Sequence, residues 1–174
     1  IPAGAGAASL EGASSSLDPG GRAIVIGYGP TGRTVTRLLR QNEISPTVVD
    51  MNMDHVRALR QEGISAIYGD ARQPDTLVSA GLRHAHTLIV SGADTGSPDI
   101  IKLARDLNPK VHIFVRGGYL RDVAQLRGAG AEQVFSGEGE VALAMTEAVL
   151  RRLGATPDQI DRERARVREE LFGT

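Results

Sequence analysis

Short apolar runs alternate with helical patterns six times between residues 22 and 153, and this alternation constrains the fold more than any other feature of the sequence. The runs are apolar along most of their length and do not alternate with polar residues as a half-exposed strand would. Such strands are typical of a parallel sheet that helices cover on both faces. The expected strands span 23–26, 47–49, 65–68, 87–90, 111–115 and 132–135.

The segments between these strands carry helical signals of their own. Pro74 and Pro98 stand where a first helical turn accepts proline, and Ser97 is the expected cap before Pro98. Strands and helices together predict an α/β protein with a doubly wound, six-stranded parallel Rossmann-type sheet in the order 3-2-1-4-5-6. One helix is expected after Gly32, and the others at 53–62, 74–81, 97–107, 119–126 and 141–153.

A glycine-rich loop lies between the first strand and the first helix. Its spacing is the G-x-G-x-x-G of dinucleotide-binding loops. The first glycine permits a tight turn, the second lets the backbone approach a pyrophosphate, and the third lets the helix pack closely on the strand. Unpaired amides at the start of the helix would face the phosphates. The loop reads Gly27-Tyr28-Gly29-Pro30-Thr31-Gly32.

An acidic residue follows at the place where such a fold binds a ribose. Asp50 ends the second strand, 18 positions after Gly32, and Met51 comes next. A carboxylate there accepts hydrogen bonds from both ribose hydroxyls and would repel a 2′-phosphate. The sequence therefore favours NAD(H) or an adenine nucleotide over NADP, with Asp50 and Met51 in the site. The alternative is a retained scaffold whose pocket stays empty.

Three further strand ends supply candidate ligand contacts, because ligands of open α/β sheets bind at the carboxyl ends of the strands. The third strand ends in a Gly-Asp-Ala turn that can reach an adenine edge, although Gly-Asp is also a common turn pair. The fourth strand ends in Ser-Gly, beside the first strand at the point where the strand order reverses. The fifth ends in an arginine that suits a phosphate or carboxylate, or a surface acid. These candidates are Gly69, Asp70, Ala71, Ser91, Gly92 and Arg116.

Groups for catalysis or metal binding are sparse in the sequence. The Tyr-x-x-x-Lys pair of short-chain dehydrogenases is missing, since the residue four positions after Tyr119 is Val123. The chain has no cysteine, which excludes metal sites built on thiolates. His84 and His86 have the spacing of a metal pair, but exposed residues leading into a strand are the simpler interpretation. We predict a binding protein and no enzyme, with a small NAD-dependent oxidoreductase as the alternative.

Composition argues against nucleic acid as a partner. The 20 basic and 21 acidic side chains give a formal net charge of −1, and only 3% of the residues are aromatic. The sequence thus lacks both the basic surface and the stacking platforms that nucleic-acid binding uses. No apolar run approaches the roughly 18 residues of a membrane span.

The two ends differ in composition from the domain expected at 22–153. Residues 1–21 are rich in Gly, Ala, Ser and Pro and are expected to form a flexible linker to an upstream part of the protein. Residues 154–174 form a charged tail that can be helical, with Ile160, Val167 and Leu171 along one side. A solvated helix is the simpler interpretation of this tail, and a packing arm is the alternative.

Several segments together carry a more specific signal than the glycine loop alone. They are 24–33, 48–50, 68–71, 80–82, 88–90, 126–135 and 138–142. The chain from Arg22 to Leu153 resembles the RCK family, also called TrkA-N or KTN domains, which regulate potassium conductance. The resemblance is closest to the cytosolic domain of Kef-type cation/proton antiporters.

The resemblance implies a regulatory domain at the cytoplasmic face of the cell membrane that gates an attached or associated cation transporter. It also implies a nucleotide at the glycine loop and a homodimer that pairs through the last helix, Val141 to Leu153. That helix is apolar around most of its circumference, so we expect the sheet to cover one side and a second copy the other.

One departure from the family narrows the expected ligand. ATP-binding members often carry an arginine just before the fifth position of the glycine loop, where this chain has Pro30. We therefore expect NAD(H), AMP or ADP, with ATP less favoured. The hypothesis is a nucleotide sensor that shifts a dimer and thereby sets ion flux. The oxidoreductase and the empty scaffold remain its alternatives.

Overall fold

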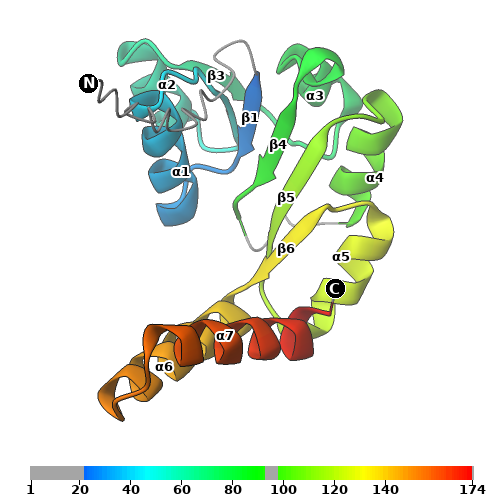
Figure 1. Ribbon diagram of the computed structural model, residues 1–174. Helices are drawn as coiled ribbons and strands as arrows, with labels where there is room; N and C mark the ends of the chain where they lie inside the picture. The colour runs from blue at the N-terminus through cyan, green and yellow to red at the C-terminus, as the bar shows by residue number, and fades with distance from the viewer. Residues whose placement is uncertain (1–21, 93–97, 174) are drawn as a thin grey trace, which may run out of the picture.

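The computed structural model describes residues 22–92 and 98–173. The linker expected at 1–21 and the expected cap Ser97 lie outside these ranges. Six parallel strands form one sheet in the order β3-β2-β1-β4-β5-β6, which confirms the predicted fold (Figure 1). The strands are β1 (Ala23–Ile26), β2 (Thr47–Asp50), β3 (Ser65–Tyr68), β4 (Thr87–Val90), β5 (His112–Gly117) and β6 (Gln133–Ser136).

Helices lie on both faces of this sheet. α1 and α2 cover the β1–β3 part of one face, while α3, α4 and α5 cover the other face (Figure 1). The short helix expected at 119–126 is a 3₁₀ turn, η2, followed by α5. The bounds are α1 (Pro30–Gln41), α2 (Met53–Gln61), α3 (Pro74–Ser79), η1 (Leu82–His84), α4 (Pro98–Leu107), η2 (Leu120–Asp122), α5 (Val123–Ala129), α6 (Gly137–Arg152) and α7 (Pro157–Phe172).

Two apolar clusters form the core, one on each face of the sheet. The larger lies between the sheet and α3–α5 and includes Ile24 and Leu88. The smaller lies beneath α1 and α2 and includes Val25, Val48 and Leu59. Because successive strand residues point to opposite faces, neighbours such as Ile24 and Val25 enter different clusters. Burial on both faces explains the nearly continuous apolar runs of the sequence.

α6 does not take the position that its composition suggests. It begins directly after β6 and runs away from the sheet instead of folding back across it (Figure 1). Gly139 and Leu143 are its only buried residues. The expectation that the sheet covers one side of this helix is therefore wrong. Three of its large apolar side chains, Val141, Met145 and Val149, are 54–63% exposed, and Leu153 just after its end is 78% exposed.

The charged tail is a helix, α7, that packs against α6. Its start is capped by Thr156, whose hydroxyl accepts the Gln159 N–H, while the Gln159 side chain accepts the Thr156 N–H. At its other end Phe172 is 6% exposed and belongs to the larger core cluster. Arg127 of α5 donates to the Phe172 carbonyl at 2.5 Å. The packing-arm interpretation thus describes this helix better than a solvated one, and we refer to α6 and α7 together as the α6–α7 arm.

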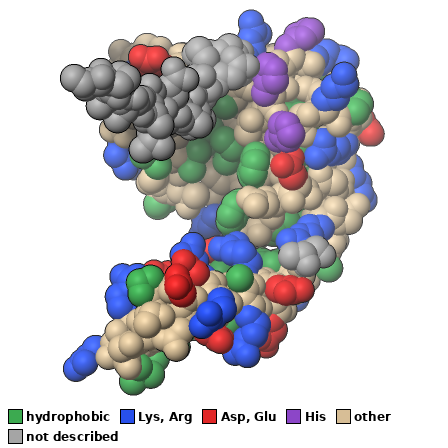
Figure 2. Space-filling view, viewed as in Figure 1, with side chains coloured by type: hydrophobic (Ala, Val, Ile, Leu, Met, Phe, Trp, Pro, Cys, Tyr) green, Lys and Arg blue, Asp and Glu red, His purple; other side chains and the backbone are tan. Residues whose placement is uncertain are grey.

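Because the arm runs away from the sheet, no helix of the described residues covers β4–β6 on the face where α1 and α2 cover β1–β3. A groove of about 420 Å³ runs along β4, β5 and β6 at this place. Figure 2 shows the hollow between the arm and the body of the protein, and side chains of both charges on the arm. We call this groove the β4–β6 groove. It is lined by Thr31, Val35, Thr87, Ile89, Val90, Ser91, Phe114, Val115, Arg116 and Phe135.

None of the helices in the two described ranges has the length and hydrophobicity needed to cross a bilayer.

The burial of Phe172 can be tested by truncating it. Phe172→Ala should lower the free energy of unfolding by about 3–5 kcal/mol, because a buried ring is lost and its site cannot fully close. Denaturant unfolding would measure the change. Val78→Ala on α3, where the side chain is 39% exposed, is the control and should stay within about 0.5 kcal/mol. Equal stability of the two variants would contradict a core role for α7.

Candidate functional site

The carboxyl ends of β1, β2 and β3 meet at a cavity of about 500 Å³, which we call the strand-end cavity. Six residues predicted from the sequence line it: Gly27, Asp50, Met51, Gly69, Asp70 and Ala71. The structure adds Arg72, which follows the Gly-Asp-Ala turn, and Asp99 in the first turn of α4. The other lining residues are Ile26, Val49 and Ile100.

The glycine loop has the backbone geometry that its spacing predicts. Gly27 has a φ of +92°, in the left-handed region that favours glycine. A Cβ at Gly32 would overlap the Gly27 carbonyl oxygen and lie 2.7 Å from the Ser91 hydroxyl. A Cβ at Gly29 would meet no atom within 4 Å, and no side chain caps the start of α1 there. Gly27 and Gly32 therefore bring loop and helix together, while Gly29 borders open space.

Ser91 holds the loop from the β4 side. Its hydroxyl lies 2.9 Å from both the Ile26 and the Gly27 carbonyl oxygens, and the residue is only 3% exposed. A Cβ at Gly27 would lie 3.1 Å from this hydroxyl and 3.4 Å from the backbone nitrogen of Gly92, so β4 packs closely against the loop. The structure thus gives Ser91 a direct role in supporting the loop, at the position where the strand order reverses.

The Asp50 carboxylate connects the loop to β2. One oxygen accepts the Tyr28 N–H at 2.7 Å, and the other accepts the Asn52 N–H at 2.7 Å and lies 3.3 Å from Nδ1 of His55. The side chain is 12% exposed. Each carboxylate oxygen has about two acceptor sites, so the oxygen that accepts the Tyr28 N–H keeps capacity for a hydroxyl. Asp50 is therefore held in one orientation at the floor of the strand-end cavity.

The turn after β3 is organised by a second carboxylate. Asp70 accepts the Arg72 N–H at 2.9 Å, and the Arg72 guanidinium donates to both Asp70 oxygens, with its shortest bond at 2.7 Å. These hydrogen bonds from Arg72 lower the pKa of the Asp70 carboxyl below its usual range. A Gly-Asp-Ala-Arg turn thus places one anion and one cation side by side at the cavity rim.

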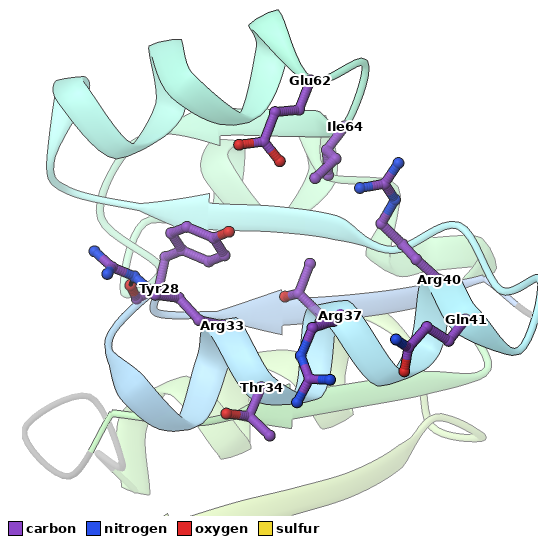
Figure 3. A pocket seen from close by; sticks show the side chains of 9 residues that line it. Tyr28, Arg33, Thr34, Arg37, Arg40, Gln41, Glu62 and Ile64 are labelled. Atoms are coloured by element: carbon purple, nitrogen blue, oxygen red, sulfur yellow. Dashed lines mark hydrogen bonds between the residues drawn. The ribbon is translucent and has the colours of Figure 1, made fainter.

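Tyr28 points to a different cavity from the rest of the predicted site. It lines a hollow of about 520 Å³ between α1 and the end of α2, where three arginines of α1 are seen in Figure 3. Arg33 donates to the Tyr28 carbonyl at 3.1 Å, and its guanidinium lies 5.4 Å from the centre of the tyrosine ring. The hollow is lined by Tyr28, Arg33, Thr34, Thr36, Arg37, Arg40, Gln41, Glu62 and Ile64.

Arg116 and Thr31 also lie away from the strand-end cavity. Both line the β4–β6 groove, as does Ser91. Arg116 shares its face of β5 with Phe114, because the two are separated by one residue of a pleated strand. The structure therefore separates the predicted set into a strand-end group, a groove group and Tyr28 in the hollow beside α1. Pro30 is the first residue of α1.

The histidines show no metal site. Within residues 22–92 and 98–173, no group of three His, Asp or Glu side chains is arranged to hold a metal ion. His84 belongs to η1 and His86 precedes β4. His112, the first residue of β5, instead pairs with Glu132, just before β6, at 2.6 Å.

Residues 23–137 match the model of the TrkA-N domain family. The chain therefore belongs to the TrkA-N family, as its sequence segments suggested. The glutathione-regulated potassium-efflux system protein KefC of Cronobacter sakazakii is 33% identical over 152 residues, which are 87% of this chain and 24% of that protein. The chain spans between 21% and 24% of the length of the curated relatives it matches.

Solved structures agree with this assignment. The TrkA-N domain of the inner membrane protein YbaL from Escherichia coli is 32% identical, with a TM-score of 0.69, and the match covers 73% of this chain and 95% of that one. The Kef C-terminal domain of Shewanella denitrificans in its AMP-bound form has a TM-score of 0.70 at 23% identity, over 86% and 91% of the two chains. The second likeness supports the fold alone.

Close packing at the glycine loop gives a sharp test of the site's architecture. Gly32→Ala should lower the free energy of unfolding by about 3 kcal/mol, because its Cβ would meet backbone atoms of Gly27 that cannot rotate away. Thermal or denaturant unfolding would measure the loss.

Gly128→Ala is the matched control for this prediction. Gly128 is a helical residue of α5, and a Cβ there would meet no atom within 4 Å. This variant should be neutral or more stable by up to about 1 kcal/mol, because alanine is the better helix former. Similar losses of stability in both variants would show that the close approach of Gly32 to Gly27 is not the cause of the loss.

Proposed function

We propose that this chain is a nucleotide-sensing regulatory domain that acts on a membrane cation transporter. The observation that carries the proposal is the strand-end cavity, where the glycine loop and the oriented Asp50 carboxylate lie at adjacent strand ends. The proposal assigns ligand binding and regulation to the chain, and no chemical reaction. Its site residues are the strand-end group, with the amides at the start of α1 for phosphate.

The expected ligand is NAD(H), AMP or ADP. A ribose next to Asp50 can donate a hydroxyl to the carboxylate oxygen that keeps acceptor capacity, whereas a 2′-phosphate would face its negative charge. The first helical turn of α1 carries no acidic side chain, so its dipole and free amides suit one or two phosphate groups. A fold neighbour from Shewanella denitrificans was solved with AMP, which supports including this nucleotide. ATP is less favoured because Pro30 stands where a phosphate-binding arginine would help.

The transporter partner is inferred from the relatives. KefC of Cronobacter sakazakii is a potassium-efflux system by name, and YbaL is an inner membrane protein. We place the domain at the cytoplasmic face of the membrane, where it meets the cellular nucleotide pool. A nucleotide can shift the domain between two arrangements only through its different affinity for each. The sensed quantity is then the redox or energy state of that pool.

The domain is proposed to work as a homodimer through α6. Val141, Met145 and Val149 follow one another at intervals of four residues, so they form one exposed apolar stripe along the helix. The β4–β6 groove offers a matching apolar surface on the body, with Phe114 and Phe135 in its lining. In a twofold dimer the arm of each copy would pack against the other copy, and this contact would bury both the α6 stripe and the groove.

Nucleotide binding is tested by the shift in thermal unfolding with NAD, NADH, AMP, ADP and ATP. A ligand at 100 times its dissociation constant adds about 2.7 kcal/mol of stability, which raises the midpoint by several degrees. We expect this shift with NAD, NADH, AMP or ADP. Asp50→Ala should remove most of it, because the ribose loses its acceptor.

Asp54→Ala is the control for Asp50→Ala. Asp54 lies four residues further on in α2, and its side chain is 89% exposed. The ligand shift of each variant is measured against its own midpoint without ligand, so a general loss of stability does not count as a loss of binding. If no nucleotide stabilises the unaltered chain, the sensing proposal is wrong.

The dimer is tested by placing charge on the apolar stripe. Met145→Glu combined with Val149→Glu should convert a dimer into a monomer, because two carboxylates would enter an apolar interface. Light scattering or sedimentation would give the mass. Val78→Glu, which charges an exposed position on α3, should leave the mass unchanged. A monomeric unaltered chain at high micromolar concentration would contradict the proposal.

A further inference from the structure

Arg72 is the one cation that lines the strand-end cavity within the described residues. It follows the Gly-Asp-Ala turn and precedes α3, and the sequence pattern did not single it out. Its side chain is 59% exposed, so the core does not need it for packing.

Arg72 is held in place by its own turn. Its Nε and Nη2 atoms donate to Asp70 in a fork, and its main-chain N–H donates to the same carboxylate. A forked pair fixes the plane of the guanidinium, so little rotamer freedom remains to be lost on binding. Asp70 occupies the Nε and Nη2 edge of the guanidinium, and these hydrogen bonds do not use its flat face.

The charges around Arg72 make it a poor phosphate ligand. Asp70 occupies the Nε and Nη2 edge of its guanidinium, and Asp99 lines the same cavity. Both acids raise the pKa of the Arg72 guanidinium, Asp70 through its hydrogen bond and, more weakly, Asp99 through its charge. A phosphate at this end of the cavity would meet two carboxylates beside the one cation. A phosphate is better placed at the start of α1, beyond the glycine loop.

A flat, uncharged ring fits this end of the cavity better than an anion. Guanidinium planes stack on π systems, and the attraction is electrostatic. Met51 also lines the cavity, from the end of the neighbouring strand, and is 61% exposed. Its polarisable thioether is a second group that contacts aromatic rings favourably. Asp50 lies directly before Met51 and is the expected ribose acceptor, so the base attached to that ribose would reach this place.

We propose that Arg72, aligned by Asp70, stacks its guanidinium face on the purine base of the bound nucleotide. This inference rests on the proposed function, since it names the part of the nucleotide that the Gly-Asp-Ala-Arg turn contacts. Arg72 is then a specificity residue for a purine base, separate from the ribose contact of Asp50 and the phosphate contacts of the glycine loop.

The test compares AMP with ribose 5-phosphate, which keeps the sugar and the phosphate but lacks the base. Calorimetry on the full 174-residue chain would give AMP affinity, and competition would give that of ribose 5-phosphate. Arg72→Ala should weaken AMP about tenfold, the order of a partly desolvated cation–π contact. It should leave ribose 5-phosphate within about twofold. Arg72→Gln keeps a donor for Asp70 and should weaken AMP similarly, because the guanidinium plane is lost.

Arg83→Ala, an exposed position on η1, is the control and should bind both ligands like the unaltered chain. Unchanged AMP affinity in Arg72→Ala and Arg72→Gln would overturn the inference. Equal weakening of AMP and ribose 5-phosphate would overturn it as well, because it would indicate a phosphate or purely structural role. If the unaltered chain binds no adenine nucleotide, the proposed function itself fails, and that result is distinct from the two others.

Discussion

The strand-end cavity depends on one carboxylate that accepts backbone N–H groups from two loops. Asp50 receives the Tyr28 N–H from the glycine loop and the Asn52 N–H from the start of α2. The glycine loop has few side chains with which to fix its own path, so its position is set by Asp50 on one side and by the Ser91 hydroxyl on the other. The surface proposed for nucleotide binding is therefore ordered by the chain's own contacts, which would lower the entropic cost of binding.

The α6–α7 arm follows from a different constraint. If α6 ran away from the sheet without a second helix beside it, its apolar surface would be exposed on all sides. α7 covers part of that surface, with Phe172 packed against Gly139. The stripe at Val141, Met145 and Val149 stays open. This division explains why a charged tail is needed in the fold and why an apolar surface is still left for a second copy, as proposed above.

Much of the site could be predicted from the sequence, because it depends on spacing along the chain. The glycine spacing and an acid at the end of β2 placed Gly27, Gly32 and Asp50 where the structure has them. The cavities that Tyr28 and Arg116 line were harder to predict, because the side chain of a loop or strand residue can point to either face of the sheet. Arg116 alternates with the buried Val115, so a strict reading of the pleat would have placed it on the opposite face.

The sequence by itself determined the parallel sheet, the strand order and the strand ends at which a ligand can bind. Those features follow from local periodicity and from the handedness of β-α-β connections, which the chain carries in every segment. Only the tertiary structure decided where α6 goes, that α7 packs on it, and that Arg72 lies beside Asp70 at the cavity. The apolar side chains of α6 favour burial, but the hydrophobic effect is not directional and so does not specify which element covers them. The pairing of Arg72 with Asp70 depends on the path of the folded backbone through the turn.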